Sequence, residues 1–134
     1  GLGRPNPFSF GSAQNHLFDP KRPGIVRLTR HPLLMALALW ALAHLIPNGD
    51  LAHVILFGVF AGFASLGGRL IDRRKRREMG QGWQTLKNDV DRQPYAIAFT
   101  SATVGDALRV IAAGLVYLGL LWLHPRIIGV NPIT

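Results

Sequence analysis

The chain has 134 residues, enough for one domain, with 49% hydrophobic residues and a formal net charge of +8. The apolar residues gather in long runs with basic residues between them, a layout typical of a polytopic membrane protein and not of a nucleic-acid-binding protein. The absence of cysteine excludes disulfides, thiolate ligands and cysteine nucleophiles. We therefore predict an all-α bundle with three transmembrane helices.

Residues 1–29 contain prolines at a density that blocks a continuous helix, and they predict an irregular N-terminal arm with a short turn near 12–17. His16 lies in this arm, where we expect it to be solvated. The chain begins at Gly1 and shows no signal peptide, so we expect it to be a processed or incomplete piece of a longer protein.

The first predicted span covers about residues 30–46. Its uncharged part is shorter than the about 20 residues that a bilayer requires. We therefore expect Arg30 and His31 to lie at the membrane interface, with His31 capping the helix or facing lipid headgroups. The turn signal at residues 47–49 ends the span and predicts a tight hairpin with the next one.

The second predicted span covers about residues 51–70. It contains small residues four apart, Gly58 with Gly62 and Ala64 with Gly68, which allow close helix–helix approach in lipid. The basic segment Arg69–Arg77 follows at once. By the positive-inside rule it places a connector, residues 71–102, in the cytoplasm, and it could bind anionic lipids.

Trp83 and Tyr95 are predicted interfacial anchors within this connector. The third predicted span covers about residues 103–123, and Asp106 and Arg109 near its start are spaced to form an ion pair. A membrane domain of residues 30–124 and a C-terminal tail of residues 125–134 complete the predicted organisation.

No paired carboxylates, Ser/His/Asp motif, phosphate-binding loop or zinc-spaced cluster is recognisable. The candidate site residue is His44, on an otherwise apolar helix. An ionised imidazole is costly in lipid, so His44 should be neutral and either hydrogen-bonded to a partner helix or bound to a metal. On a helix it shares a face with an aromatic and small or aliphatic residues, among them Trp40 and Ala41, a surface that can seat a flat macrocycle.

The other histidines do not join this candidate site. Thirteen residues separate His31 from His44, about 20 Å along a helix, so the two cannot share one metal. His53, across the hairpin, and His124 are expected to be interfacial.

The sequence resembles the NnrU family of membrane proteins. The resemblance covers about residues 25–124 and is carried by Thr29-Arg30-His31-Pro32, Trp40-Ala41-Leu42-Ala43-His44, Asn48-Gly49-Asp50, Phe57-Gly58, Asp72-Arg73-Arg74 and, more weakly, Gln93-Pro94-Tyr95-Ala96.

The family also resembles the plant 15-cis-zeta-carotene isomerase, a membrane haem b protein with a similar Arg-His-Pro and Trp-x-x-Ala-His framework. This resemblance implies that His44 is a haem ligand beside Trp40, that the second haem histidine falls upstream of Gly1, and that a cysteine of the isomerase is replaced by Ala41. Members of the NnrU family have further spans before the matching region, so the resemblance also implies that this chain lacks N-terminal spans of the full protein. The family name implies a bacterial inner-membrane protein linked to nitrite and nitric oxide metabolism.

Two alternatives remain open. Arg-His-Pro at a span start, a hairpin and a basic segment also resemble isoprenylcysteine methyltransferases, whose acidic-arginine element has only Asp72-Arg73 as a counterpart here. The small residues of the second span also fit a non-enzymatic subunit that packs on a larger membrane complex.

Overall fold

The structure is a computed structural model that describes residues 4–10, 14–47 and 49–129, and every structured element in these ranges is helical. The prediction of an all-α fold is confirmed. The chain divides into two compact units, residues 1–101 and residues 102–134.

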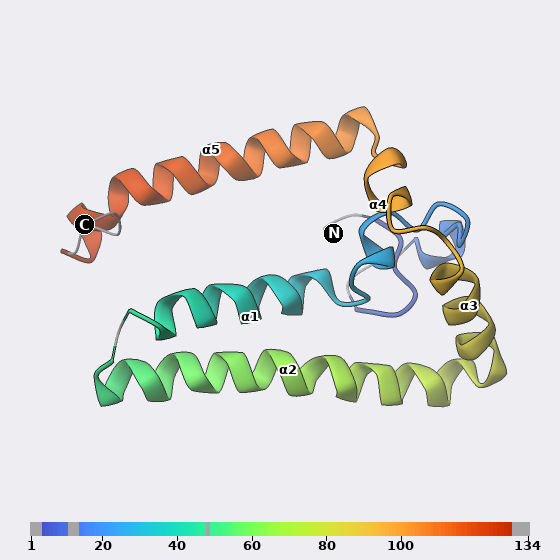
Figure 1. Cartoon of the computed structure of the whole chain (residues 1–134), viewed down its shortest axis with the longest axis horizontal. Coiled ribbons are helices and arrows are strands. Elements are labelled where there is room, and N and C mark those ends of the chain that lie inside the picture. Colours follow the sequence, from blue (N-terminus) through green and yellow to red (C-terminus); the bar gives the residue numbers. More distant parts are fainter. Residues whose placement is uncertain (1–3, 11–13, 48, 130–134) are drawn as a thin grey trace. The chain divides into compact units, whose positions relative to one another are not determined.

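The first unit is built on a helical hairpin. Helix α1, Pro32–Leu45, and helix α2, Leu51–Met79, lie side by side and run antiparallel (Figure 1). Pro32 occupies the first turn of α1, and Asp50 caps α2 by accepting a hydrogen bond from the backbone N–H of His53 at 3.2 Å.

Two helices, not three, are long and apolar enough to cross a membrane: α2 and α5, Val104–Ile127. The prediction of a first span over residues 30–46 is wrong in this respect, because α1 has only 14 residues. At 1.5 Å per residue α1 is about 21 Å long, against a hydrocarbon core of about 30 Å. These two apolar helices support a membrane location.

Helix α2 continues well past its predicted end at residue 70 and carries the basic segment as part of one helix of 29 residues. It ends at Gly80, whose φ of +55° is a conformation that favours glycine. Figure 1 shows the chain turning sharply there into α3, Gln81–Asp91, which is followed by the short helix α4, Ile97–Thr100.

The arm packs against α3 and forms a small core. It contains two 3-10 turns, η1 at Asn15–Leu17 and η2 at Gly24–Arg27. Phe8 and Val26 from the arm meet Trp83 and Val90 from α3, and all four are buried. We call these four residues the arm core. The predicted interfacial role of Trp83 is wrong, because its side chain is 1% exposed in the arm core.

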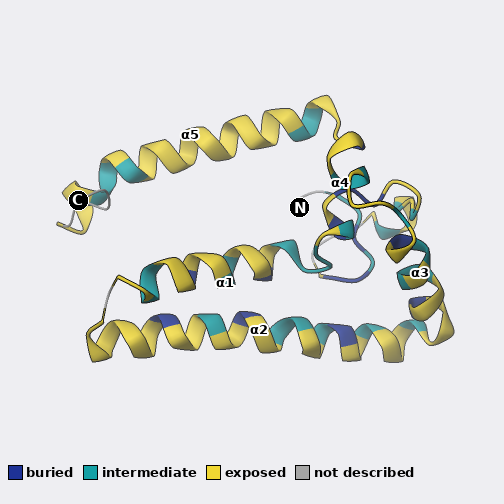
Figure 2. Cartoon of the chain, in the orientation of Figure 1, coloured by how far each residue is buried: buried dark blue, intermediate teal, exposed yellow. Residues whose placement is uncertain are grey.

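Side-chain packing between α2 and the segment of α1 uses small residues, and of the two predicted pairs it involves Ala64 and Gly68 but not Gly58 and Gly62. Ala41 and Ala64 are buried, and a Cβ added to Gly67 would lie 3.3 Å from Leu34. A Cβ added to Gly58 or Gly62 would meet nothing within 4 Å. In Figure 2 the buried positions of α2 follow the side that faces α1, and the other positions of the helix are intermediate or exposed.

The second unit consists of α5 and the residues around it. Thr103 and Asp106 form a capping box at its start, and Arg109 binds Asp106 at 2.9 Å, which confirms the predicted pair. Apart from its polar ends the helix is apolar, and no residue of its most hydrophobic stretch is buried.

Candidate functional site

The aromatic cluster at the turn end of the hairpin contains the predicted site residue. His44, in the last turn of α1, packs its ring 4.8 Å from Trp40 and 5.1 Å from Phe57 of α2. Trp40 also packs edge-to-face on Phe57 at 5.4 Å and on Phe60 at 5.7 Å. The hairpin thus sets one imidazole among three large aromatic rings, as the sequence pattern predicts for Trp40 and His44.

The hydrogen bonding of His44 fixes its tautomer. Nδ1 lies 2.9 Å from the backbone carbonyl oxygen of Trp40. A carbonyl oxygen only accepts, so Nδ1 carries the hydrogen and the lone pair of a neutral ring is on Nε2. An imidazole oriented by an Nδ1–H···O=C bond is the usual form of a histidine that binds a metal through Nε2.

The cluster is better suited to supplying one histidine ligand to a planar cofactor than to forming a metal site from protein side chains alone. In the described ranges, three or more His, Asp or Glu side chains nowhere gather closely enough to hold a metal ion. Trp40 is 45% exposed, so the cluster presents an aromatic surface outside the hairpin. The residues present therefore fit a haem ligand role for His44, which stays a prediction.

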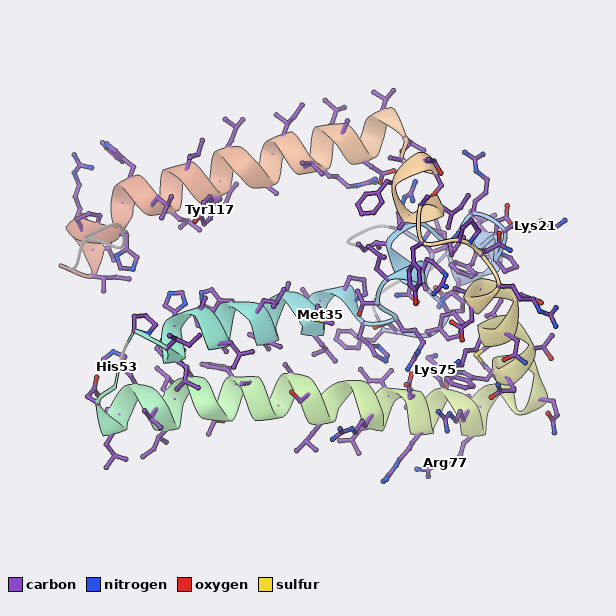
Figure 3. The ribbon with its side chains drawn as sticks, viewed as in Figure 1. Lys21, Met35, His53, Lys75, Arg77 and Tyr117 are labelled. Carbon is purple, nitrogen blue, oxygen red and sulfur yellow. The ribbon has the colours of Figure 1, made fainter. Side chains whose placement is uncertain are left out.

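His53 lies close to this cluster but is used differently. Its ring stacks on Phe57 at 5.9 Å, and its Nδ1 pairs with the carboxylate of Asp50 at the start of α2 (Figure 3). The backbone N–H of His53 lowers the pKa of Asp50, and the side-chain bond adds to the effect. His53 is thus part of a helix cap.

A second polar site, at the other end of the hairpin, is centred on the carboxylate of Asp72. Arg30 donates from Nε to Oδ1 at 3.3 Å and from Nη2 to Oδ2 at 2.7 Å. His31 Nε2 lies 3.1 Å from Oδ1. Asp72 is buried, and the His31 side chain is only 12% exposed, so the prediction that His31 faces lipid headgroups is wrong.

The N-terminal arm is fastened to this site. The second ring nitrogen of His31, Nδ1, lies 3.2 Å from the hydroxyl of Ser9. Asn6 donates from Nδ2 to the carbonyl oxygen of Arg30 at 2.8 Å. We call Ser9, Arg30, His31 and Asp72 the Asp72 clamp. It joins the arm, the start of α1 and the middle of α2.

Carboxylate, imidazole and hydroxyl follow one another here in the order found in serine hydrolases. The sequence does not predict this set, because His31 is 22 residues from Ser9 and 41 residues from Asp72. Ser9 is 8% exposed and Arg30 shares the carboxylate, and both facts favour a structural role.

Asp72 could have been singled out from the sequence by one signal: it is the only acidic residue within the basic segment Arg69–Arg77. A carboxylate is rarely buried unless it is paired, so a lone acidic residue among basic neighbours suggests a partner from another element. The contacts with Arg30 and His31 give Asp72 a structural role in the first unit.

No curated protein and no solved structure matches the chain. The family model described as NnrU protein matches residues 2–132, nearly the whole chain. The chain therefore belongs to the NnrU family.

Proposed function

We propose that this NnrU protein is a haem-associated membrane protein in which His44 donates its Nε2 lone pair to the haem iron. Trp40 and Phe57 would form the apolar wall against which the macrocycle packs. A haem b held in this way supplies an iron centre for electron transfer or substrate activation. The protein side of the site supplies orientation of the imidazole and exclusion of water.

The single observation that carries this proposal is the Nδ1 hydrogen bond of His44 to the Trp40 carbonyl oxygen. It keeps the lone pair on Nε2 and fixes the ring plane between Trp40 and Phe57. A histidine that served only as a polar contact between helices would not need both its tautomer and its ring plane set by its own hairpin.

The proposal includes a topology. α2 and α5 cross the bacterial inner membrane, and the basic end of α2 lies in the cytoplasm with the arm and α3, in keeping with the positive-inside rule. Exposed arginines of that end, Arg69, Arg73 and Arg77, would contact anionic lipid headgroups (Figure 3 labels Arg77). The turn between α1 and α2, with His44 and His53 beside it, would then lie toward the opposite face.

The reaction that we propose is one of two, both taken from the resemblance and both compatible with a haem at His44. The first is redox support of nitrite and nitric oxide metabolism. The second is a carotenoid-isomerase-type reaction.

The test is the optical spectrum of the full-length protein purified in detergent from cells supplied with haem. We expect a Soret band in the wild type that is lost or strongly shifted in His44→Ala. The matched control is His53→Ala, which removes the other imidazole packed on Phe57. A Soret band that persists unchanged in His44→Ala, or is lost equally in both variants, contradicts ligation by His44.

A second candidate is a non-enzymatic subunit of a larger membrane complex. The observation that favours it is the open stripe on α2, where added Cβ atoms on Gly58 and Gly62 would meet no atom of the described residues within 4 Å. Small residues of this kind admit a partner helix at short range. Copurification of a stoichiometric assembly with no haem on this chain, disrupted by Gly62→Leu, would favour this candidate over the first.

A further inference from the structure

A pocket of about 210 Å³ lies beside the Asp72 clamp, within the first unit and at the opposite end of α1 from His44. Its walls come from the arm, from the segment between η2 and α1, and from α3. The lining includes three cations, Arg27, Arg30 and Lys87, and one carboxylate, Asp91. A single water needs only about 10–15 Å³, so the pocket has room for a small polyatomic ligand. We call it the arm pocket.

Positive charge exceeds negative charge around the arm pocket. Lys87 pairs with Asp91, and Arg30 pairs with Asp72. Arg27 donates from Nε to the carbonyl oxygen of Gln93 and stacks 3.9 Å above the ring of Tyr95. Neither of these partners carries a negative charge, so three cations share two carboxylates and one positive charge remains.

Hydrogen-bond donors also exceed acceptors. A guanidinium has five N–H groups and an ammonium has three. Arg30 gives two to Asp72, Arg27 gives one to Gln93 and Lys87 gives one to Asp91. These three side chains have thirteen N–H donors, and nine of them have no acceptor in the described part of the chain. The Arg30 and Lys87 side chains are 35% and 27% exposed, so an incoming ligand can reach them.

We propose that the arm pocket binds a phosphate group through Arg27, Arg30 and Lys87. Planar guanidinium groups match phosphate oxygens in pairs, and an ammonium adds a point charge to the same site. A tetrahedral anion suits three cations contributed by three different segments better than a planar carboxylate does. The pocket lies where the apolar helix α1 begins, so the phosphate can come from a solute or from a phospholipid headgroup. The proposal is independent of haem binding at His44.

The test uses the full chain in detergent, in phosphate-free buffer of constant ionic strength. One titration adds inorganic phosphate and another adds short-chain phosphatidic acid, and binding is followed by ³¹P NMR line broadening and by the thermal unfolding midpoint. We expect saturable binding in at least one titration, weakened at least about tenfold in Arg27→Met and in Lys87→Met, because each loses a charge-assisted hydrogen bond.

The matched control is Arg22→Met, which removes an exposed cation of the arm that does not line the pocket. Phosphate binding identifies a solute site, and binding of phosphatidic acid alone identifies a headgroup site. Lys87→Met keeps the test valid if Arg27→Met fails to fold. Absence of saturable binding in both titrations, or an equal loss in Arg22→Met, overturns the proposal.

Discussion

Replacement of Asp72 by asparagine tests whether the Asp72 clamp holds the arm on the hairpin. The carboxylate receives the Arg30 bonds at 3.3 and 2.7 Å and faces His31 at 3.1 Å. Asparagine keeps the shape but removes the charge and one acceptor oxygen. A hydrogen bond to a charged group contributes about 1.5–3 kcal/mol. The long bond counts for little, and Arg30, at 35% exposure, is partly screened by solvent.

We therefore expect Asp72→Asn to lower the free energy of unfolding by about 2–3 kcal/mol. The assay is denaturant-induced unfolding in detergent, followed by circular dichroism, with limited proteolysis of the arm as a second readout. The matched control is Glu78→Gln, the same chemical change on the same helix, where the 41% exposed carboxylate pairs only within α2. This control should lower the free energy of unfolding much less, because solvent screens its ion pairs. Equal effects of the two substitutions, with the arm equally protected, would refute the reasoning.

Three further predictions use the same unfolding assay. Gly68→Ala should destabilise the protein by about 1–3 kcal/mol, because the added Cβ would lie 3.2 Å from the His31 ring. Gly58→Ala is the control: the added Cβ meets no described atom within 4 Å, so this variant should be neutral or more stable by up to about 1 kcal/mol. Phe8→Ala should cost about 3–5 kcal/mol and expose the arm to protease, because the ring is fully buried against α3; unchanged proteolysis would contradict the arm core. Asp50→Ala should lower the unfolding midpoint at pH 7. The folded pKa of Asp50 lies below its ordinary value of 3.8, so the stabilisation by its carboxylate is present at neutral pH and is lost as the pH falls through the folded pKa. A wild-type advantage that persists below the folded pKa would contradict the cap.

The features that the sequence predicted well are local ones. Long apolar runs predicted the helices, the signal at residues 47–49 predicted the turn between α1 and α2, and a spacing of three predicted the Asp106–Arg109 pair. Each depends on neighbours within one or two helical turns. The grouping of Trp40 with His44 on one face followed from helical periodicity in the same way.

The features that were missed depend on contacts between distant segments. Trp83 reads as an interfacial anchor until its partner Phe8 is known, and their rings meet edge-to-face at 6.1 Å. From the sequence, His31 is predicted to contact lipid headgroups; its contact with Asp72, which is distant in the sequence, is seen only in the structure. Gly58 and Gly62 show that a helix has small residues, but the face that packs against α1 depends on the helix rotation, which composition does not fix.

The arm core has a consequence for how the protein is made. Phe8 is synthesised before the hairpin and Trp83 only after the whole hairpin. At about 5–20 residues per second, Phe8 waits roughly 4–15 s for its partner. During that interval an apolar arm is accessible to chaperones and proteases, while α1 and α2 are already available for insertion. The order of synthesis thus means that the arm can pack against α3 only after the hairpin has been made.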